Sequence, residues 1–373
     1  MLSSAEKQRY QKHLLLPEVG AEGQERLKNA RVLVVGAGGL GCPVLLYLAA
    51  AGVGTLGIVD GDTVDETNLQ RQVLYDAADV DRPKATTAAA QLRRLNDLID
   101  YEVFTTHLVA ENAASIIERF DLVVDCTDNF SVRYLINDVC VLSEKPFVYG
   151  AIHRFEGQVS VFNYPSNGVL GPTYRCLFPN PPSGLEIPNC SEVGVLGILP
   201  GMIGMYQANE VIKIITGVGK VLSGELMLMD LLENTQRKMK FKRRSDAEML
   251  AQQGMETHRK LAANVLLPNE ISAIELMRQL KREPDTFLLD VRNSDEYEVC
   301  HLPGAVLIPM PTIPTSVKHI PRDRPVIVYC HHGMRSASVI QYLEQEHGYD
   351  NLTNLNGGIH AWADEVDLRM AKY

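Results

Sequence analysis

The stretch VLVVGAGGLG, residues 32–41, contains the clearest fold signal in the first part of the chain. Its apolar run predicts a buried strand, and Gly36, Gly38 and Gly41 follow at G-x-G-x-x-G spacing, directly before a helical pattern. Such glycines allow a tight turn and let phosphate oxygens approach backbone amides at the start of the helix. The next predicted strand ends on Asp60, an acidic residue suited to ribose hydroxyls. Together these features predict an adenine-nucleotide site, for which a nicotinamide or flavin dinucleotide is the default ligand.

Strand and helix patterns alternate around this loop, which predicts a mostly parallel sheet covered by helices on both faces. We therefore expect an α/β, Rossmann-like doubly wound fold. At 373 residues the chain is too long for one average core, and a second, smaller α/β pattern begins at Asn269. The polar segment before it lacks periodicity. The expected division is a first domain over 1–243, a linker over 244–267 and a second domain over 268–373.

A short loop after Asp60 concentrates charged and polar side chains. The sequences DGDTVDETNLQRQ and RPK supply Asp62, Asn68, Arg71, Gln72 and Lys84. A dehydrogenase does not need this density of charge near a pyrophosphate. An enzyme that cleaves ATP does, because Arg and Lys offset charge that develops on the phosphates and a carboxylate can hold Mg²⁺. A later strand ends in DCTDN, which puts Asp125 and Asp128 where ligands of open α/β sheets bind.

These motifs, in this order and spacing, resemble the ATP-using adenylyltransferases of the MoeB/ThiF/HesA type, which are relatives of ubiquitin-activating enzymes. The resemblance covers roughly Arg9 to Glu233. It implies that the carboxyl end of a small ubiquitin-like sulfur-carrier protein, of the MoaD/ThiS type and ending in Gly-Gly, attacks the α-phosphate of ATP. The products would be a carrier acyl-adenylate and pyrophosphate. The resemblance also implies a homodimer.

The resemblance assigns roles at matching positions. Gly38 and Gly39 would line the phosphates, Asp60 would bind the ribose, and Asp128 would hold Mg²⁺. The triphosphate would be contacted by Asn68, Arg71 and Lys84. The family also reaches across the dimer interface with the second arginine of an R-Y-x-R motif. Here the motif reads RYQK, with Arg9 and Lys12, and a lysine keeps the charge but lacks the bidentate fork.

The seven cysteines include no CxxC pair, a pattern that fits a reducing cytoplasm. Many relatives bind a structural zinc through two CxxC pairs, but only Cys176 remains here, so we expect no zinc. Packing is the expected role of Cys42, Cys126, Cys140 and Cys300. Cys190, in PNCSEVGVLG, is either a partly buried loop residue or, as the resemblance implies, a thiol that faces the acyl-adenylate.

The second domain contains the loop YCHHGMRS, which puts Cys330 between a strand and a helix. Together with LLDVRNSDEYEVCHLPGA and LNGGIHAW this loop resembles a rhodanese domain over about Asn269 to Trp362. Loop amides, the helix dipole and Arg335 would stabilise the thiolate and then the outer sulfur of a persulfide. Phosphatases of related folds place five residues between cysteine and arginine, and the tighter spacing of four here favours sulfur transfer.

The combined prediction is that the Cys330 persulfide attacks the adenylated carrier and yields a carrier thiocarboxylate. As a hypothesis, Cys190 then attacks the acyl disulfide and leaves a transient Cys190–Cys330 disulfide. Two other classes remain open: a nicotinamide-dependent oxidoreductase fused to a sulfurtransferase, and a carrier-recruiting protein with an inactive half. The sequence selects neither the pathway (molybdopterin, thiamine, tRNA thiolation or cysteine synthesis) nor the sulfur donor, thiosulfate or a cysteine desulfurase.

A net charge of -10 argues against a general nucleic-acid or membrane-surface binder. The opening MLSSAEKQRYQKH has no apolar core behind its charges, so we expect no signal peptide. The longest apolar stretch, 41–59, is interrupted by Pro43 and by glycines, and it predicts a helix, a turn and a strand rather than a membrane span. These features predict a cytoplasmic protein.

Overall fold

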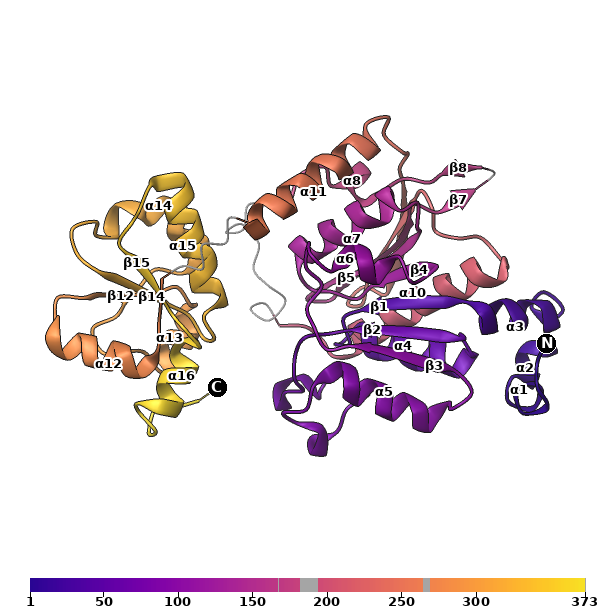
Figure 1. Ribbon diagram of the computed structural model, residues 1–373, viewed down its shortest axis with the longest axis horizontal. Coiled ribbons are helices and arrows are strands. Elements are labelled where there is room, and N and C mark those ends of the chain that lie inside the picture. Colours follow the sequence, from indigo (N-terminus) through magenta and orange to yellow (C-terminus); the bar gives the residue numbers. More distant parts are fainter. Residues whose placement is uncertain (167, 182–193, 264–268, 373) are drawn as a thin grey trace. The chain divides into compact units, whose positions relative to one another are not determined.

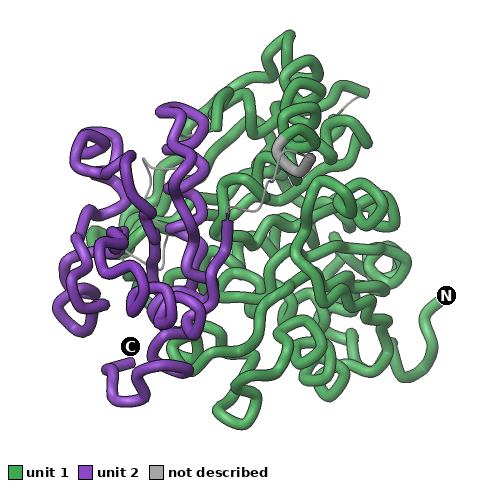
Figure 2. The backbone as a smooth tube through the Cα atoms, turned by 60° about the vertical axis from the view of Figure 1, so that its left-hand side comes forward, with its two compact units in different colours: residues 1–181, 189–260 green, residues 182–188, 261–373 purple. Residues whose placement is uncertain are grey.

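The structure, a computed structural model, describes residues 1–166, 168–181, 194–263 and 269–372 (Figure 1). The chain divides into two compact units, whose described residues lie in 1–260 and 261–372 (Figure 2). Within the described residues the first unit holds a sheet of eight strands in the order β10-β9-β6-β5-β4-β1-β2-β3. These strands are β1 (Arg31–Val35), β2 (Thr55–Val59), β3 (Asp100–Phe104), β4 (Leu122–Asp125), β5 (Phe147–His153), β6 (Glu156–Phe162), β9 (Glu225–Asp230) and β10 (Thr235–Lys240).

The strands from β5 to β3 are parallel, whereas β6, β9 and β10 extend the sheet in antiparallel fashion. β1 is paired with β2 on one side and β4 on the other, so the chain reverses its winding direction at the carboxyl ends of β1 and β4. Such a switch point is where open α/β sheets bind ligands. The basic strand β10 is exposed along its whole length at the edge of the sheet, where its charges remain solvated.

Helices cover both faces of this sheet and bury two apolar clusters. One cluster holds residues of α3 (Gly20–Asn29), α4 (Gly41–Ala51), α5 (Lys84–Leu95) and α10 (Ile198–Thr216). The other holds residues of α6 (Ala113–Ile117), α7 (Phe130–Leu142), α8 (Tyr174–Leu177) and α11 (Ala247–Ala263). Shorter elements complete the unit: α1 (Ser4–Arg9), α2 (Gln11–Leu14), the 3-10 helices Glu66–Asn68 and Ala77–Asp79, and the hairpin β7 (Pro165–Ser166) and β8 (Val169–Leu170).

α11 differs from expectation, because it occupies most of the segment 244–267 that the sequence predicted to be an unpatterned linker. Its inward side is built from small or flexible residues, Ala251, Gly254 and Met255. A Cβ at Gly254 would lie 2.0 Å from Oδ2 of Asp138, which is already paired with Arg175, so only glycine fits over this buried ion pair. The sequence does contain apolar residues at helical spacing in this segment, but they are only weakly hydrophobic. The expectation of an irregular linker was therefore wrong for 247–263.

The second unit has a five-stranded parallel sheet within the described residues, in the order β11-β15-β14-β12-β13. The strands are β11 (Glu270–Ile271), β12 (Phe287–Asp290), β13 (Val306–Leu307), β14 (Val326–Tyr329) and β15 (Leu352–Leu355). One face packs against α12 (Ala273–Arg282) and α16 (Gly358–Glu365), the other against α14 (Ile313–Ser316) and α15 (Met334–His347). α13 (Ser294–Val299) and the 3-10 helices Met310–Thr312 and Val317–His319 lie in the connections.

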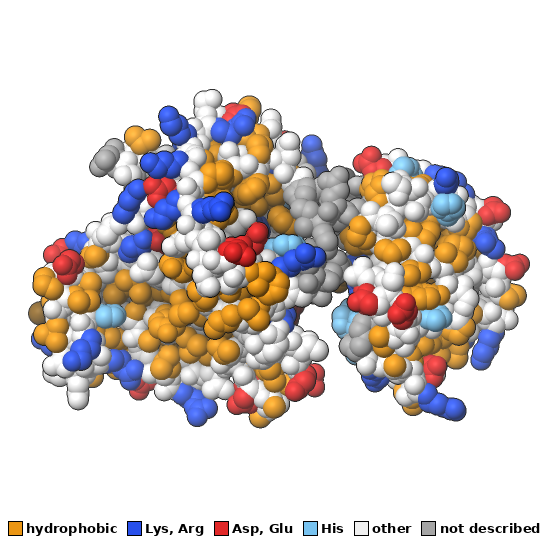
Figure 3. Space-filling model, turned by 180° about the vertical axis from the view of Figure 1, so that it is seen from behind, with side chains coloured by type: hydrophobic (Ala, Val, Ile, Leu, Met, Phe, Trp, Pro, Cys, Tyr) orange, Lys and Arg blue, Asp and Glu red, His pale blue; other side chains and the backbone are white. Residues whose placement is uncertain are grey.

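The predicted fold class, a doubly wound α/β domain followed by a smaller α/β domain, is confirmed. In the part of the chain that the structure describes, no helix is both long and apolar enough to cross a membrane. Hydrophobic side chains cover a broad area of the first unit in the view of Figure 3.

Candidate active sites

The glycine loop after β1 adopts a backbone that only glycine tolerates at two points. Gly36 has φ of +95°, and a Cβ there would lie 2.7 Å from the carbonyl oxygen of Cys126 after β4. A Cβ at Gly41 would lie 1.9 Å from the carbonyl oxygen of Gly36. The loop therefore folds tightly onto itself and against β4, and α4 begins at the edge of the switch point. Free amides at the start of a helix favour an anion such as a phosphate.

Asp60, at the end of β2, braces this loop. Its Oδ2 accepts a hydrogen bond from the Ala37 amide at 2.7 Å, and its Oδ1 accepts one from the Asp62 amide at 2.9 Å. Burial is the main reason that the pKa of the Asp60 carboxyl lies above its ordinary value. The carboxylate is thus fixed beside the glycine loop.

Residues of the charged loop converge on the same edge. Nζ of the buried Lys84 lies 3.2 Å from Oδ2 of Asp62, and Nε2 of Gln72 donates to Oδ1 of Asn68 at 2.5 Å. Oε1 of Gln72 is buried without a hydrogen-bond partner among the described residues. A buried polar atom of this kind is costly unless a ligand or water satisfies it.

The glycine loop and the charged loop are neighbours in space. A Cβ built on Gly38 would lie 3.6 Å from Nε2 of Gln72, and one built on Gly39 would lie 3.6 Å from Cδ of Arg71. The predicted nucleotide residues Gly36, Gly38, Gly39, Gly41, Asp60, Asp62, Asn68, Arg71, Gln72 and Lys84 therefore share one edge of the sheet. The glycine cradle fits a phosphorylated ligand, and the unsatisfied amide oxygen of Gln72 can accept a hydrogen bond from a donor group of that ligand.

The two aspartates after β4 have different environments. Asp125 is fully buried and its Oδ2 accepts a hydrogen bond at 2.9 Å from Nε of Arg133, so it is part of an internal ion pair. Asp125 also raises the pKa of Arg133 against the effect of its burial, which keeps the guanidinium charged. Asp128, by contrast, is exposed just beyond the strand. Of the pair, Asp128 is the carboxylate available to a metal ion.

Arg9 and Lys12 lie away from this edge. Arg9 donates from Nη1 to the carbonyl oxygen of Leu95, the last residue of α5, at 2.7 Å. Lys84 is the first residue of the same helix, and twelve residues span roughly 17 Å. Lys12, on α2, is exposed. Figure 1 shows α1 and α2 near α3, which leads into the start of β1. Within one chain these two cations do not reach the glycine loop.

The cysteines of the first unit fall into two groups. Cys42, Cys126 and Cys140 are buried, and burial raises the pKa of each thiol, that of Cys42 to about 12, as expected for packing residues. Cys176 is half-buried, and its sulfur accepts hydrogen bonds from the amides of Thr173 and Arg244. Cys190 lies outside the described residues.

Cys330 follows β14, the central strand of the second unit, and precedes α15. Its sulfur accepts a hydrogen bond from the Gly333 amide at 3.1 Å and one from Oγ of Ser336 at 3.4 Å. Gly333 has φ of +93° and caps the start of α15, so its amide can turn toward the sulfur. The thiol thus lies at the N-terminus of a helix with two hydrogen-bond donors on its sulfur, one of them a loop amide.

Arg335 has a partner that the sequence did not reveal. Its guanidinium forms two hydrogen bonds with the carboxylate of Glu296, at 2.7 and 2.6 Å, and both side chains are largely buried. Glu296 comes from α13. The buried Arg292, which pairs with Asp290, donates hydrogen bonds to the carbonyl oxygens of Glu296 and Cys300 and so holds the C-terminal part of α13. Glu296 also accepts a hydrogen bond from the Asn293 amide, an N-cap signal visible in the sequence NSDE.

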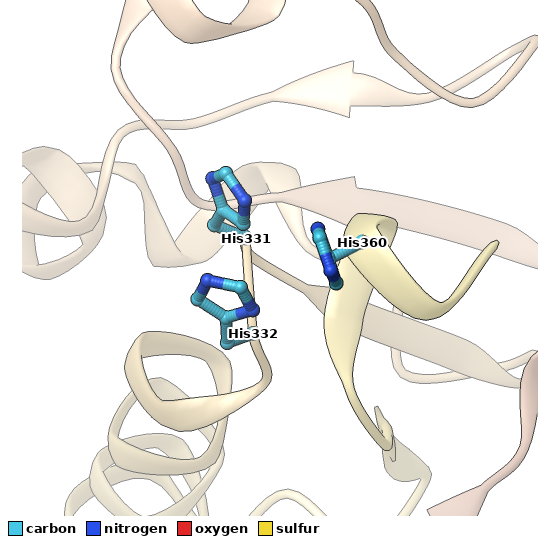
Figure 4. A group of neighbouring side chains, drawn as sticks. All are labelled: His331, His332 and His360. Carbon is cyan, nitrogen blue, oxygen red and sulfur yellow. The ribbon is translucent and has the colours of Figure 1, made fainter. Parts of the chain in front are cut away.

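Three histidines that the sequence analysis did not single out gather beside the thiol loop. His331 and His332 follow Cys330, and His360 comes from α16 (Figure 4). One ring nitrogen of each lies within 4.8 Å of those of the other two. Burial, followed by the charges of the other two rings, lowers the pKa of His331 to about 4. The doublet HH in the loop was a visible signal, but the third histidine is some thirty residues further along the chain.

Comparison with known proteins assigns each half of the chain to a protein family. Residues 10–250 match the ThiF family, and residues 272–365 match the rhodanese-like domain. The chain is 42% identical to the Mycobacterium tuberculosis protein named "Probable adenylyltransferase/sulfurtransferase MoeZ", covering 100% of this chain and 96% of that one. It is 38% identical to "Adenylyltransferase and sulfurtransferase MOCS3" of Sus scrofa, over 100% of this chain and 89% of that one.

A shorter relative matches the first unit alone. The Thermus thermophilus "Sulfur carrier protein adenylyltransferase" is 52% identical over 236 residues, which cover 63% of this chain and 87% of that one. Among solved structures, E. coli MccB with MccA-N7isoASN has a TM-score of 0.58 at 22% identity, over 66% of this chain and 75% of that chain, which shows a shared fold. The chain belongs to the ThiF family, in the group of two-domain adenylyltransferase/sulfurtransferases that carry a rhodanese-like domain after the adenylation domain.

Proposed function

We propose that this enzyme uses ATP to adenylate the C-terminal glycine of a ubiquitin-like sulfur-carrier protein and then converts that glycine to a thiocarboxylate with sulfur from Cys330. The observation that carries the proposal is the presence, in one chain, of a glycine cradle lined by Arg71 and Gln72 and of a thiol cradled at the start of α15. The names of the full-length relatives, which pair adenylyltransferase with sulfurtransferase, support this combination.

In the first reaction, a carboxylate oxygen of the carrier attacks the α-phosphorus of ATP. The bond between the α-phosphorus and the bridging oxygen breaks, and pyrophosphate leaves with the electron pair. Arg71 and Lys84 would offset the charge that develops on the phosphates, while Asp60 would position the ribose. The unpartnered Oε1 of Gln72 would gain a hydrogen-bond donor from the bound substrate.

Asp128 is the residue that we assign to Mg²⁺, because an exposed carboxylate at the switch point suits a hard cation that keeps most of its water ligands. Bound there, Mg²⁺ would neutralise charge on the triphosphate. We assign no zinc to the first unit, since the sulfur of Cys176 is already surrounded by backbone donors and no CxxC pair accompanies it.

In the second reaction, the Cys330 thiolate first takes a sulfur atom from a donor. With thiosulfate, the outer sulfur is transferred to Sγ and sulfite leaves. The outer sulfur of the persulfide then attacks the acyl carbon of the adenylated carrier, and AMP leaves with the electron pair. The product is an acyl disulfide joined to Cys330. The amide of Gly333 and the hydroxyl of Ser336 would stabilise the sulfur anion during these steps.

Release of the thiocarboxylate requires a second thiol, and Cys190 is the one that we propose. Its thiolate would attack Sγ of Cys330 and break the S–S bond, so that the carrier leaves as a thiocarboxylate anion. A Cys190–Cys330 disulfide remains, and a cellular dithiol reductant must reduce it before the next turnover. A cycle that depends on free thiols fits the reducing cytoplasm.

We further propose a homodimer in which Arg9 and Lys12 serve the glycine loop of the partner subunit. Arg9 bonds to the end of α5 that is remote from Lys84, and Lys12 lies on the next helix, α2. Large apolar side chains are exposed on the packed helices α4 and α10, among them Tyr47, Ile198 and Met205, and a partner would remove them from water. We also propose a division into an adenylation domain, extended from 1–243 to 1–260 because α11 packs on the first unit, and a rhodanese domain over 268–373.

Carrier-dependent isotope exchange between pyrophosphate and ATP tests the first half. We expect exchange with a carrier that ends in Gly-Gly, and its loss in Arg71→Ala. Exchange that persists in Cys330→Ala would show that adenylation needs no sulfur. The absence of exchange with every carrier would instead favour a carrier-recruiting protein.

A further inference from the structure

The strongest feature outside the reaction just described is the histidine cluster beside Cys330. It is formed by His331, His332 and His360, and it joins two segments that are remote in sequence (Figure 4). The ring centroids of His331 and His332 are 4.1 Å apart, those of His332 and His360 are 4.9 Å apart, and those of His331 and His360 are 5.7 Å apart. The sulfur-transfer chemistry uses none of these rings.

The backbone holds the two segments together. The amide of Ile359 donates to the carbonyl oxygen of Cys330 at 2.9 Å, and the amide of His360 donates to that of His331 at 3.1 Å. Gly358 makes this approach possible, since a Cβ there would lie 2.2 Å from the carbonyl oxygen of His331. These backbone hydrogen bonds therefore hold the first turn of α16 against the thiol loop, and they fix the positions from which the three rings extend.

The donor set suits a transition metal ion. Imidazole nitrogens bind Zn²⁺ at about 2.0–2.1 Å, and two ligands of a tetrahedral ion are then about 3.4 Å apart. The three nitrogens lie within 4.8 Å of one another, so small side-chain rotations bring them to that spacing. Three imidazoles with an open fourth position are a common zinc arrangement. The carboxylate of Asp364 lies 3.4 Å from Nε2 of His360 and adds negative charge beside the cluster, although it also pairs with Lys372.

We propose that His331, His332 and His360 form a binding site for a divalent transition-metal ion, Zn²⁺ in the first place, that regulates Cys330. An ion held there would fix His331 and His332 to α16. These two residues connect Cys330 to Gly333, whose amide holds the sulfur. The loop must accommodate both a sulfur donor and the carrier's acyl group, so an ion that immobilises it slows sulfur transfer reversibly.

Zinc titration of the metal-stripped full-length protein, followed by calorimetry, tests this site, with Co²⁺ absorption as an independent report on the ligands. We expect one Zn²⁺ per chain at this site. His360→Gln removes one imidazole and weakens that binding at least about tenfold. His319→Gln is the matched control, because His319 is exposed in the same unit and lies outside the cluster. It should bind like the wild type.

Two further variants and a rate measurement separate the alternatives. Cys330→Ser should keep the Co²⁺ spectrum, and loss of binding in that variant would mean that the thiolate holds the ion, which overturns the proposal. Zn²⁺ should inhibit sulfur transfer from thiosulfate to cyanide in the wild type and in His319→Gln, and much less in His360→Gln. Equal binding or equal inhibition in His360→Gln, or no saturable binding in the wild type, also overturns it. The binding measurements need no carrier and no ATP, so they stand apart from the function proposed above.

Discussion

The guanidinium of Arg335 is bound at two points by the carboxylate of Glu296, with Nη1 2.7 Å from Oε2 and Nη2 2.6 Å from Oε1. Arg335 is the second residue of α15, directly after the loop that holds Cys330, and Glu296 belongs to α13, so the pair connects the start of α15 to another part of the unit. The arginine that the sequence assigns to sulfur chemistry is thus also a structural clamp.

This double role predicts that stability and activity can be separated. Arg335→Met removes the guanidinium that neutralises the largely buried carboxylate of Glu296, and it should lower the free energy of unfolding of the second unit by about 1–3 kcal/mol and reduce sulfur transfer. The double variant Glu296→Gln/Arg335→Met also removes the carboxylate charge, so denaturant unfolding should show recovered stability while sulfur transfer stays low. Recovery of both would mean that Arg335 acts only through the structure.

The glycine loop offers a matched pair of substitutions. A methyl group at Gly41 would overlap the carbonyl oxygen of Gly36, so Gly41→Ala should lower the free energy of unfolding by about 3 kcal/mol or more. At Gly38 the methyl group meets only Nε2 of Gln72 at 3.6 Å, an ordinary contact.

Gly38→Ala should therefore keep the wild-type stability and weaken ATP binding by about tenfold or more, since the methyl group occupies the space of a phosphate. Thermal unfolding and nucleotide titration of both variants check this. Normal ATP binding by Gly38→Ala would show that the glycine loop is not part of the nucleotide site.

Replacement of Asp60 should have a pH-dependent effect on stability. Its carboxyl has a folded-state pKa above the ordinary value of 3.8, mainly because of burial. A raised pKa means that this group contributes stability below pH 3.8 and that the contribution is lost as the pH rises through the folded-state pKa. Asn at this position can accept only one of the two amide hydrogen bonds, so Asp60→Asn should lower stability and weaken nucleotide binding. Because Asn does not titrate, this loss of stability should be smaller at neutral than at acidic pH.

The pH dependence of the free energy of unfolding tests the direction of the pKa shift of Asp60. Unfolding curves should show that the stability lost in Asp60→Asn, relative to the wild type, becomes smaller as the pH rises from acidic to neutral values. The control is Asp128→Asn, because Asp128 is exposed and its replacement should leave stability unchanged. A loss that grows with rising pH would contradict the raised pKa of Asp60.

α11 provides a test of where the first unit ends. Met255 is buried among residues of the first unit, whereas Met249 on the same helix is half exposed. Met255→Ala should lower the free energy of unfolding of that unit by about 2–5 kcal/mol, and Met249→Ala should change it by no more than about 0.5 kcal/mol. Calorimetry of the full chain reports the effect. Equal effects of the two variants would mean that α11 belongs to the linker and not to the first unit.

The sequence predicted well those parts in which a residue type itself determines the backbone conformation. Only glycine leaves room for the neighbouring backbone at Gly36 and Gly41, and Gly333 has the positive φ that lets its amide bond to Cys330. The pairing of Arg335 with Glu296 could not be read in this way, because the two residues are 39 positions apart and meet only through the fold. α11 was missed because its buried side consists of alanine, glycine and methionine, which give a weak apolar period.

We propose that adenylation in the first unit and sulfur transfer in the second act in sequence on one carrier. The intact mass of a carrier ending in Gly-Gly, after incubation with the protein, Mg-ATP and thiosulfate, tests this order of reactions. We predict replacement of one carboxyl oxygen by sulfur, and in Cys330→Ala an adenylated or unchanged carrier with normal pyrophosphate release. A wild-type reaction that stops at that same stage would rule out the coupled reaction, because the second unit would then serve a different acceptor.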